Sequence, residues 1–458
     1  MSTIISSDLE NEKAAISSFD AFFKTYRIGS FLKRAHAYKS KGIPVLLLFR
    51  ILFEQVFFTR SLHMTFLQNP VSIPCKKDTL YRFLHSIHTN WILFTTALSN
   101  QIIQKTLLPL TPADRKNVLI IDDSFFSRER SKKVELLSNV YDHTDHRYKR
   151  GYRMLTVGWS DGNTYLPINQ VLLSSQDAKN RYQEAQPVDQ RTAGGKRRQL
   201  AITPAPQVVN TLLEITKKEK IPAQYVLFDS WFTNPSSLIA IRKIGYDVVG
   251  MLKKSKTIHL IHNGTAKTLM EIYKQSRKRP GRSRYLLTAE VTVQKGKESC
   301  PARLVYVRNR NKRSEYLCLI CTDMTLTCEE VIQLYGRRWE IEVFFKYCKS
   351  YLHLAKECRS LSYDAITAHT AIVFTRYMFL AVENRKQKDP RTLGELFYLL
   401  HDEMQVITFS EVLSIFMSLL KEALQESCFL SQKQIDQLLD LFMDHLPNLF
   451  LTLLHPTA

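Results

Sequence analysis

The sequence predicts a mixed α/β protein in which short hydrophobic strands form the core and helices form both ends of the chain. Two apolar runs, residues 118–121 and 225–228, have the length of buried strands, and each is followed by an aspartate. Residues 1–112 repeat apolar side chains at helical spacing, whereas residues 258–322 alternate and are rich in β-branched side chains. Together these sequence patterns favour a sheet with flanking helices and a separate β-rich region.

The N-terminal region is expected to be helical, with helices near residues 28–37, 45–59 and 91–108 separated by Gly42-Ile-Pro44 and Asn69-Pro70. Residues 74–84 predict a further helix, capped at Asp78 and carrying basic and aromatic side chains. Such a helix either reads DNA as the second member of a helical pair or belongs to the core. The sequence leaves both interpretations open.

The middle of the chain predicts strands at residues 118–121, 152–159, 165–173, 225–228, 247–252, 290–293, 302–307 and 316–321. Residues 176–206 carry many polar and turn residues and predict a long loop. Thr327 and Glu330 fit a capping box that begins a second helical region. That region continues to the end of the chain, with a break at Lys388-Asp389-Pro390.

The chain is strongly basic: 64 Lys and Arg oppose 43 Asp and Glu, for a net charge of +21. A polyanionic partner is the simplest implication, and charge alone does not choose between DNA, RNA and an anionic membrane. The apolar residues 45–58 are interrupted by Arg50 and Glu54 and are shorter than the ~20 residues of a membrane span. We therefore expect a buried helix there, no membrane segment and, since the N-terminus does not resemble a secretory signal, a cytoplasmic protein.

Two clusters have the residue types of a metal site but also a plainer interpretation. Cys318 and Cys321 have zinc-like spacing, with Cys300 and Cys328 as further thiols, yet residues 316–321 alternate like a strand. His143-Thr-Asp-His146 is equally typical of a solvated loop. Buried thiols and solvated histidines are the favoured interpretations.

Residues 335–349, YGRRWEIEVFFKYCK, hold the most informative pattern of the chain. Tyr335, Arg338, Glu342 and Lys349 lie at offsets of zero, three, seven and fourteen residues. At about 100° per helical residue these side chains fall within an arc of roughly 60°. One carboxylate, two cations and a phenol on a single helical face can hold a metal ion beside a phosphate, and a solvated amphipathic face is the alternative.

Asp122 and Asp229 each follow a strand-like run and can meet Glu342 at one end of a sheet. Hard divalent cations prefer oxygen ligands, and two such ions can activate a water or a 3′-hydroxyl and stabilise the leaving oxygen of a phosphodiester. Asp123 follows Asp122 directly. Because side chains alternate along a strand, we expect only Asp122 to enter the site, with Asp123 behind it or capping the next turn.

These residues together resemble the DDE transposases of bacterial insertion sequences; they are Asp122-Asp-Ser124, Asp229-Ser-Trp231 and the face Tyr335, Arg338, Glu342 and Lys349. Tyr, two residues, Arg, three residues, Glu, six residues, Lys is the signature of the branch called the insertion-sequence-four family. The resemblance covers residues 117–354. It implies a ribonuclease H-like core, a mixed sheet with flanking helices, interrupted by a β-rich insertion between the second aspartate and the glutamate.

The resemblance also implies an activity and a set of site residues. Such enzymes bind the terminal inverted repeats of their own element as a homodimer, cleave its ends and join the 3′-hydroxyl ends to target DNA. Asp122, Asp229 and Glu342 are then the catalytic ligands of two Mg²⁺ ions, with Mn²⁺ as a possible replacement. Tyr335, Arg338 and Lys349 hold phosphates of the cleaved end.

This interpretation divides the chain into a helical DNA-binding region, a two-part catalytic core, an insertion and a C-terminal region. The respective residues are 1–112, 113–252 with 325–385, 253–324, and 386–458. Apolar helical spacing in residues 407–424 and 435–454 fits either a dimer surface or a core. Basic residues of two expected loops are further candidates for DNA contact: Arg191, Lys196, Arg197, Arg198, Arg277, Lys278, Arg279, Arg282 and Arg284.

A hairpin step and the catalytic step itself each have alternatives. Relatives that form a DNA hairpin often hold a flipped base with a Trp of the insertion, and here that region has only Tyr273, Tyr285, Tyr306 and Tyr316 as substitutes. A DNA-binding protein that has lost catalysis and a nuclease without strand transfer are the competing functions. Presence of all three acids favours an active transposase over the first.

Overall fold

The computed structural model describes residues 18–57, 74–142, 145–280, 283–309, 315–386 and 432–444, and the single positions 66, 417, 420, 421 and 424. The chain separates into two compact units. The larger comprises Ile28–Phe53 and Pro74–Lys388, and the smaller comprises Met1–Arg27, Glu54–Ile73 and Asp389–Ala458. The expected breaks at Asn69-Pro70 and residues 388–390, part of the His143 cluster, Arg282 and most of the C-terminal region lie outside the described residues.

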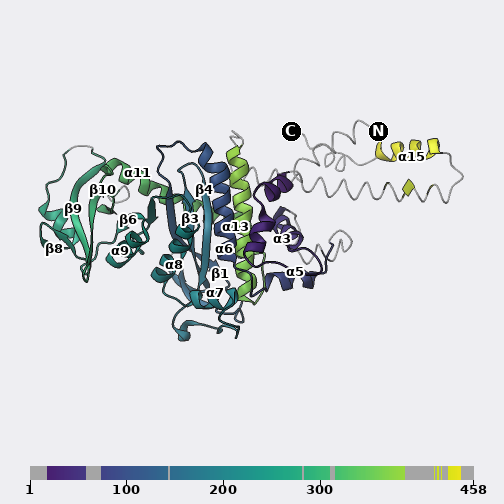
Figure 1. The fold of residues 1–458 in the computed structure, drawn as a ribbon, viewed down its shortest axis with the longest axis horizontal. Helices are drawn as coiled ribbons and strands as arrows, with labels where there is room; N and C mark the ends of the chain where they lie inside the picture. The colour runs from purple at the N-terminus through teal and green to yellow at the C-terminus, as the bar shows by residue number, and fades with distance from the viewer. Residues whose placement is uncertain are drawn as a thin grey trace. The chain divides into compact units, whose positions relative to one another are not determined.

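A mixed sheet with helices on its faces forms the larger unit, as the sequence predicts (Figure 1). The described residues give an 11-stranded sheet of order β2-β3-β1-β5-β6-β11-β10-β9-β7-β8, with β4 also paired to β3. The strands are β1 Val118–Ser127, β2 Ser138–Asp142, β3 Arg147–Ser160, β4 Tyr165–Leu173, β5 Tyr225–Phe228, β6 Asp247–Leu252, β7 Leu260–His262, β8 Thr265–Lys267, β9 Tyr285–Lys295, β10 Glu298–Arg308 and β11 Tyr316–Cys321. All eight predicted strands are confirmed; β2, β7 and β8 were not predicted.

Helices of the larger unit contact β1, β3 and β4 and the outer strands β6, β9, β10 and β11. Helices α6 and α13 lie side by side on β4 (Figure 1). Helix α12 contacts β1, and α9 and α11 contact β6. The helices are α2 Ile28–Arg34, α3 Val45–Glu54, α5 Lys77–Leu84, α6 Trp91–Ile102, α7 Ala193–Ala201, α8 Ala205–Lys218, α9 Pro235–Ile244, α10 Leu269–Gln275, α11 Cys328–Gly336, α12 Glu340–Ser350 and α13 Tyr363–Lys386. Shorter turns are η1 Gln55–Phe57, η2 Ile103–Leu107, η3 Leu108–Leu110, η4 Ala178–Asn180 and η5 Arg337–Trp339.

Two helix starts test the capping predictions. The Thr327 side chain accepts a hydrogen bond from the Glu330 backbone N–H, and the Glu330 side chain accepts one from the Thr327 backbone N–H. The predicted capping box is therefore confirmed. The cap predicted at Asp78 is wrong: α5 begins at Lys77, and its N-cap, Lys76, makes no side-chain capping bond.

In the smaller unit, the rings of Phe19 and Phe57 are 5.2 Å apart, and α15, Gln432–Asp444, buries two apolar residues.

Residues 176–206 are not the long loop that the sequence predicts, because they contain η4 and the helix α7. Thr192 caps α7 by accepting a hydrogen bond from the Gly195 backbone at 3.0 Å. Arg197 and Arg198, on the following turn, are buried. The expectation that these two arginines contact DNA from a surface loop is therefore corrected; Arg191 and Lys196 remain exposed.

Four buried charged side chains fix α7 to the start of α13. Arg198 donates to Glu135 at 2.6 Å and to Asp364 at 2.7 Å, and Arg197 donates to Asp364 at 2.8 Å. Glu135 also accepts hydrogen bonds from the backbone of Gln186 and Tyr363. With two cations, two anions and several backbone donors, the network compensates its own burial.

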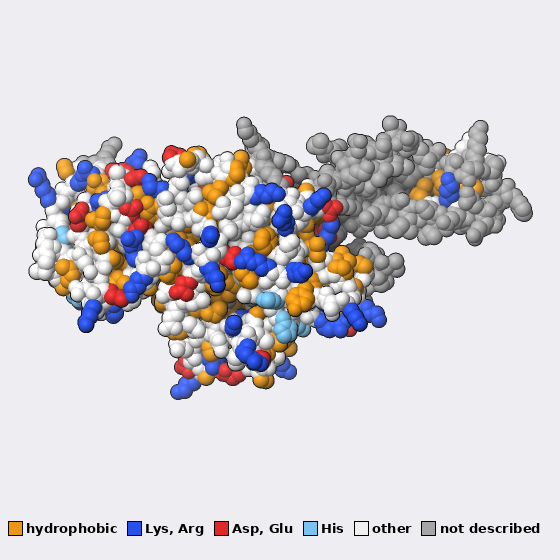
Figure 2. Space-filling model, viewed as in Figure 1, with side chains coloured by type: hydrophobic (Ala, Val, Ile, Leu, Met, Phe, Trp, Pro, Cys, Tyr) orange, Lys and Arg blue, Asp and Glu red, His pale blue; other side chains and the backbone are white. Residues whose placement is uncertain are grey.

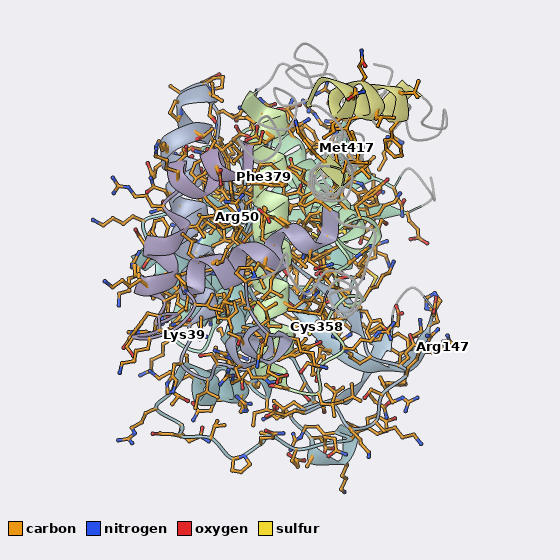
Figure 3. The ribbon with its side chains drawn as sticks, turned by 90° about the vertical axis from the view of Figure 1, so that its right-hand side faces the viewer. Lys39, Arg50, Arg147, Cys358, Phe379 and Met417 are labelled. Atoms are coloured by element: carbon orange, nitrogen blue, oxygen red, sulfur yellow. The ribbon has the colours of Figure 1, made fainter. Side chains whose placement is uncertain are left out.

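Helix α13 is the central helix of the larger unit. By length and composition, Tyr363–Arg385 could cross a membrane, but its most apolar window is fully buried within the protein, as in the core helix of a globular fold. Phe379 of α13 contacts Phe53 of α3 with ring centroids 5.9 Å apart. Figure 3 labels Phe379 on α13 and Arg50 on α3. The helix therefore joins the sheet to the N-terminal helices.

An ionic group at the middle of α13 includes a histidine held neutral by its surroundings. Arg376, fully buried, donates to Glu357 at 2.7 Å and to the carbonyls of Leu52 and Phe53. His369 Nδ1 lies 3.8 Å from a Glu357 oxygen. Burial lowers the pKa of His369 to about 4, and the nearby Arg376 acts in the same direction.

We expect Arg198→Met to lower the free energy of unfolding by about 3–5 kcal/mol, because Glu135 and Asp364 would keep buried charges without their partner. Urea denaturation measures this change. The matched control is Arg191→Met, whose side chain is 91% exposed and which should shift stability by less than about 0.5 kcal/mol. Equal effects of the two variants would contradict the buried network.

We expect stability to fall as pH drops from about 6.5 toward 4, because unfolded His369 takes up a proton in this window and folded His369 does not. The folded pKa is depressed, so this loss is absent above the unfolded pKa and totals roughly 3 kcal/mol at low pH. The difference in melting temperature between pH 7.5 and pH 5 should be smaller in His369→Gln than in the unmodified protein. His259→Gln, at an exposed position, is the control and should leave the difference unchanged.

Candidate active site

Two neighbouring parallel strands bring Asp122 and Asp229 together. Strands β1 and β5 pair with Val118 opposite Tyr225 and Ile120 opposite Leu227. Continuing this register by two residues puts Asp229 beside Asp122, and adjacent strands are about 4.8 Å apart. The strand predicted to end at Ile121 in fact continues to Ser127, since β3 pairs with β1 along its whole length. Asp122 thus lies at the level where β5 stops and β1 continues.

Glu342 reaches this position from α12 through an arginine. Arg338 donates to Glu342 Oε1 at 2.6 Å and to Asp122 Oδ2 at 3.2 Å. The helix predicted over residues 335–349 is present but not uniform: α11 ends at Gly336, η5 forms one tighter turn, and α12 begins at Glu340. Arg338 and Glu342 still share one face, as the spacing predicts.

Tyr335 and Lys349 lie on either side of this ion pair. Tyr335 is close enough to Arg338, Asp229 and Asp122 for their charges to act on its hydroxyl, and burial raises the pKa of Tyr335 to about 12. Lys349 donates to Ser124 Oγ at 2.7 Å, two residues along β1 from Asp122. Burial lowers the pKa of Lys349. Five of the six predicted site residues are therefore neighbours of one another, with Arg338 linking Asp122 to Glu342, and Lys349 extends the site along β1.

The neighbouring acid points elsewhere. Asp123 pairs with Arg153 of β3 through its Oδ2, at 2.7 Å from Arg153 Nε, and does not share the Arg338 contact of Asp122. The prediction that the two aspartates diverge is confirmed. Arg153 also lies 5.5 Å from the ring of Trp231, which is 60% exposed. Sequence reasoning did not select Arg153 or Trp231, although Trp231 follows Asp229 by two residues.

Charge is incompletely balanced at Asp122. Burial raises the pKa of Asp122 to about 7, the negative charges of Asp229 and Asp123 add to this rise, and Arg338 opposes it. Two carboxylates that are close together and short of positive charge form a natural position for a divalent cation. Asp122 and Asp229 thus fit a metal ion by ligand chemistry and by electrostatics.

Glu342 does not complete the ligand set in this conformation. Within the described parts of the chain, no three His, Cys, Asp or Glu side chains are grouped closely enough to hold a metal. The Arg338 guanidinium lies between Asp122 and Glu342, where it supplies the positive charge that an ion would bring. For Glu342 to act as a third ligand, Arg338 must release it.

The other expected contact residues lie apart from this point. Arg277, Lys278, Arg279 and Arg284 are exposed between α10 and β9. Lys278 lies 4.5 Å from the ring of Tyr273, and Arg279 lies 4.5 Å from that of Tyr285. The surface in Figure 2 shows Lys and Arg side chains spread over the viewed face, with fewer Asp and Glu.

Of the four tyrosines considered for base holding, three pack against one another. Ring centroids of Tyr273 and Tyr316 are 4.1 Å apart, and Tyr306 lies within 5.4 Å of both. Tyr306 is fully buried, and its hydroxyl donates to the Leu269 carbonyl. These rings form a small core between α10, β10 and β11. The thiols of Cys318 and Cys321 are buried on the same strand, β11.

A mixed sheet that presents paired aspartates beside a helix-borne glutamate, lysine and arginine has the features of a metal-dependent phosphodiester nuclease. Comparison with protein families agrees: the description "DDE superfamily endonuclease" matches residues 63–313, more than half of the chain. No curated protein matches the chain. The chain therefore belongs to the DDE superfamily of endonucleases. Membership indicates a transposase-like nuclease that acts on DNA, in a family that generally uses divalent metals.

The matched residues include Asp122 and Asp229, whereas Glu342 lies beyond them. The family match thus supports the kind of enzyme and does not itself assign the third acid.

We expect Arg338→Gln to bind Mn²⁺ roughly tenfold more tightly in the absence of DNA, because the ion no longer displaces two charge-assisted hydrogen bonds. Calorimetric titration at pH 8.5, where Asp122 is ionised, measures the affinity without any cleavage assay. Arg337→Gln is the matched control, since Arg337 donates instead to the Lys116 carbonyl. Unchanged or weaker Mn²⁺ binding by Arg338→Gln would refute the competition between Arg338 and the metal.

Proposed function

We propose that this chain is a DNA transposase of an insertion sequence, from the insertion-sequence-four branch of the DDE enzymes. It binds the terminal inverted repeats of its element, cleaves the ends with two Mg²⁺ ions and joins the 3′-hydroxyl ends to target DNA. The observation that carries the proposal is that strand register sets Asp229 beside Asp122 and that Arg338 links Asp122 to Glu342. Its working form is a homodimer in the complex that joins both ends.

The strand order supports a ribonuclease H-like core. Strands β4, β3, β1, β5 and β6 are consecutive, with β3 antiparallel to β1 and β5 and β6 parallel to it. The segment from β7 to β10 lies between Asp229 and Glu342 in sequence, as expected for the β-rich insertion. Its exposed cations Arg277, Lys278 and Arg279 suit contacts with the DNA backbone.

Each residue of the helical face has a role in this reaction. Asp122, Asp229 and Glu342 hold the metal ions. Tyr335 keeps its proton at neutral pH because its pKa is about 12, so it donates a hydrogen bond to a phosphate oxygen. Arg338, once released from the acids, and Lys349 neutralise phosphate charge at this site.

The bound divalent ions supply the Lewis acidity that activates the attacking oxygen and stabilises the leaving one. The chain contributes the fixed orientation of its acids. Asp122 and Asp229 are set by the rigid pairing of β1 and β5, whereas Glu342 depends on the conformation of Arg338. A switch of Arg338 from the acids to DNA phosphate would couple DNA binding to completion of the metal site.

The test uses a plasmid that carries the two ends of the element, incubated with the protein and Mg²⁺. We expect Asp122→Asn to reduce end cleavage by about 10³-fold or more, because a lost metal ligand costs several kcal/mol in the transition state. Asp123→Asn is the matched control; it removes the neighbouring carboxylate, which binds Arg153, and should cut within about tenfold of the unmodified protein.

Cleavage by Asp122→Asn at the parental rate would overturn the metal-site assignment. Joined products separate the proposal from its alternatives. Cut ends without joining identify a nuclease that lacks strand transfer, and specific binding of the ends without any cutting identifies a DNA-binding protein that has lost catalysis.

A further inference from the structure

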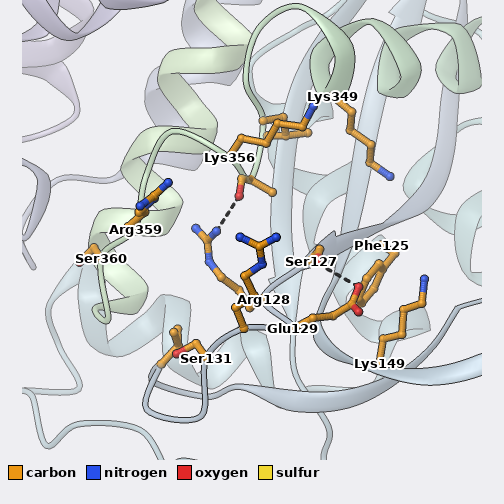
Figure 4. Close-up of a pocket in the computed structure, with 14 residues that line it drawn as sticks. Phe125, Ser127, Arg128, Glu129, Ser131, Lys149, Lys349, Lys356, Arg359 and Ser360 are labelled. Carbon is orange, nitrogen blue, oxygen red and sulfur yellow. Dashed lines mark hydrogen bonds between the residues drawn. The ribbon is translucent and has the colours of Figure 1, made fainter. Parts of the chain in front are cut away.

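A large cavity opens next to the candidate active site and is not explained by the metal ligands. Its volume is about 930 Å³, within the ~300–1,000 Å³ range of cavities that hold small ligands. Its walls come from the end of β1 with the segment after it, from Lys149 of β3 and from the turn that follows α12 (Figure 4). Lys349 belongs both to this cavity and to the helical face of the active site.

The cavity is lined by many more cations than anions. Its basic residues are Arg128, Arg130, Lys149, Lys349, Lys356 and Arg359, and its acidic residue is Glu129. Lys149 is balanced by Asp142, at 2.8 Å, and by Asp145. None of the other five cations has a carboxylate within ion-pair distance among the described residues. A concave surface with this excess of positive charge concentrates polyanions.

Arg128 is the informative member because it is half-buried and has no carboxylate within ion-pair distance among the described residues. It donates to the carbonyls of Ala355, at 2.7 Å, and Cys358, at 2.6 Å, while its Nε is buried with no partner in the described structure. Burial lowers the pKa of Arg128. A buried donor without an acceptor costs folding free energy, and an anionic ligand could supply the missing acceptor. These bonds also hold the turn after α12 against the end of β1.

An aromatic ring accompanies the cations. Phe125 lines the cavity, and the Lys149 ammonium lies 5.7 Å from its ring centroid. Gly151, on the neighbouring strand, has no room for a Cβ because the ring and the Phe126 carbonyl occupy that space. The ring of Phe125 therefore packs against the backbone of β3 at Gly151. Cations beside an aromatic face are the usual composition of sites for unpaired nucleic acid strands.

The distance from the cavity to Asp122 is consistent with a DNA strand that spans both. Phe125 and Ser127 are three and five residues beyond Asp122 on β1, which is about 10 to 17 Å at strand spacing. Because these offsets are odd, both side chains lie on the face of the sheet opposite to Asp122, and a DNA strand would reach them over the edge of β1 that β5 leaves unpaired. A DNA strand that keeps the stacked spacing of a duplex advances about 3.4 Å per nucleotide. A strand whose phosphate lies at Asp122 would therefore reach the cavity about three to five nucleotides away.

We propose that this cavity binds a short unpaired segment of the DNA strand, three to five nucleotides from the phosphate held at Asp122 and Asp229, with Arg130, Lys356 and Arg359 contacting its phosphates and Phe125 stacking on a base. The inference rests on the proposed function, because it takes the phosphate to be held at those acids. It adds a site that separates the strand from its complement next to the cleaved bond.

The test measures binding of fluorescent duplexes in EDTA, without cleavage. One duplex is blunt, and two others carry a five-nucleotide thymidine tail on the 3′ or the 5′ end. We expect one tail polarity to increase affinity at least tenfold. In the double variant Lys356→Ala/Arg359→Ala, at two exposed positions, this gain should disappear and the slope of log affinity against log salt should fall by about 1.4, or about 0.7 per lost contact with a single strand.

The matched control comes from a second cavity between α8 and α9, which contains Lys218 and Lys243. Lys218→Ala/Lys243→Ala removes the same charge and should keep the gain and the salt slope. A second measurement maps the contact directly: 5-iododeoxyuridine at the fourth tail position should cross-link to Phe125 or to the segment that follows β1, as read by mass spectrometry.

Several results would overturn the inference: no gain from either tail, a gain that survives Lys356→Ala/Arg359→Ala, an equal loss in the control variant, or cross-links only elsewhere. Displacement of the tail by thymidine monophosphate at equal nucleotide concentration would assign the cavity to a free nucleotide and also overturn it. Failure of the proposed function is distinguishable, since a protein that binds tails in this way yet cuts no DNA in Mg²⁺ contradicts only the catalytic proposal.

Discussion

The ion pairs of Arg338 are the interaction on which the candidate site depends. Asp122 lies between β3 and β5 in the sheet, with Asp229 beside it, and Glu342 approaches from α12. Without a cation, these partly buried carboxylates would repel one another. Arg338 compensates Asp122 and Glu342 at once and thereby holds α12 over β1. The Arg338 guanidinium occupies the position that a metal ion would take between Asp122 and Glu342. The acids are therefore held in place, but Glu342 is not available as a metal ligand until Arg338 releases it.

The register of β1 and β5 determines the rest of the geometry. Because β5 ends at Phe228 while β1 continues to Ser127 against β3, the sheet has an open step at Asp122. At Asp122 the acids face α12. From Phe125 onward, the end of β1 lines the cationic cavity together with the turn that follows α12. One strand therefore supplies the metal ligand and the path along which a DNA strand can leave it.

Local patterns predicted those parts of the molecule that depend on local causes. Alternation and apolar runs located eight strands, and helical spacing placed Arg338 and Glu342 on one face. The patterns did not separate Arg197 and Arg198 from surface loop cations, because their burial depends on Glu135 and Asp364, each more than sixty residues away in sequence. The cavity was missed for the same reason, since its walls come from β1, β3 and the turn after α12.

Pairing, rather than the number of charges, distinguishes structural cations from those available to a ligand. A net charge of +21 indicates an anionic partner without locating it. Arg197, Arg198 and Arg376 are buried with carboxylates and stabilise the fold. Arg128 is half-buried with no carboxylate partner among the described residues, and its buried Nε lacks an acceptor there, which costs folding free energy. Such a cost is understandable where an anionic ligand restores the balance, and Arg128 faces the cavity that continues from the acids.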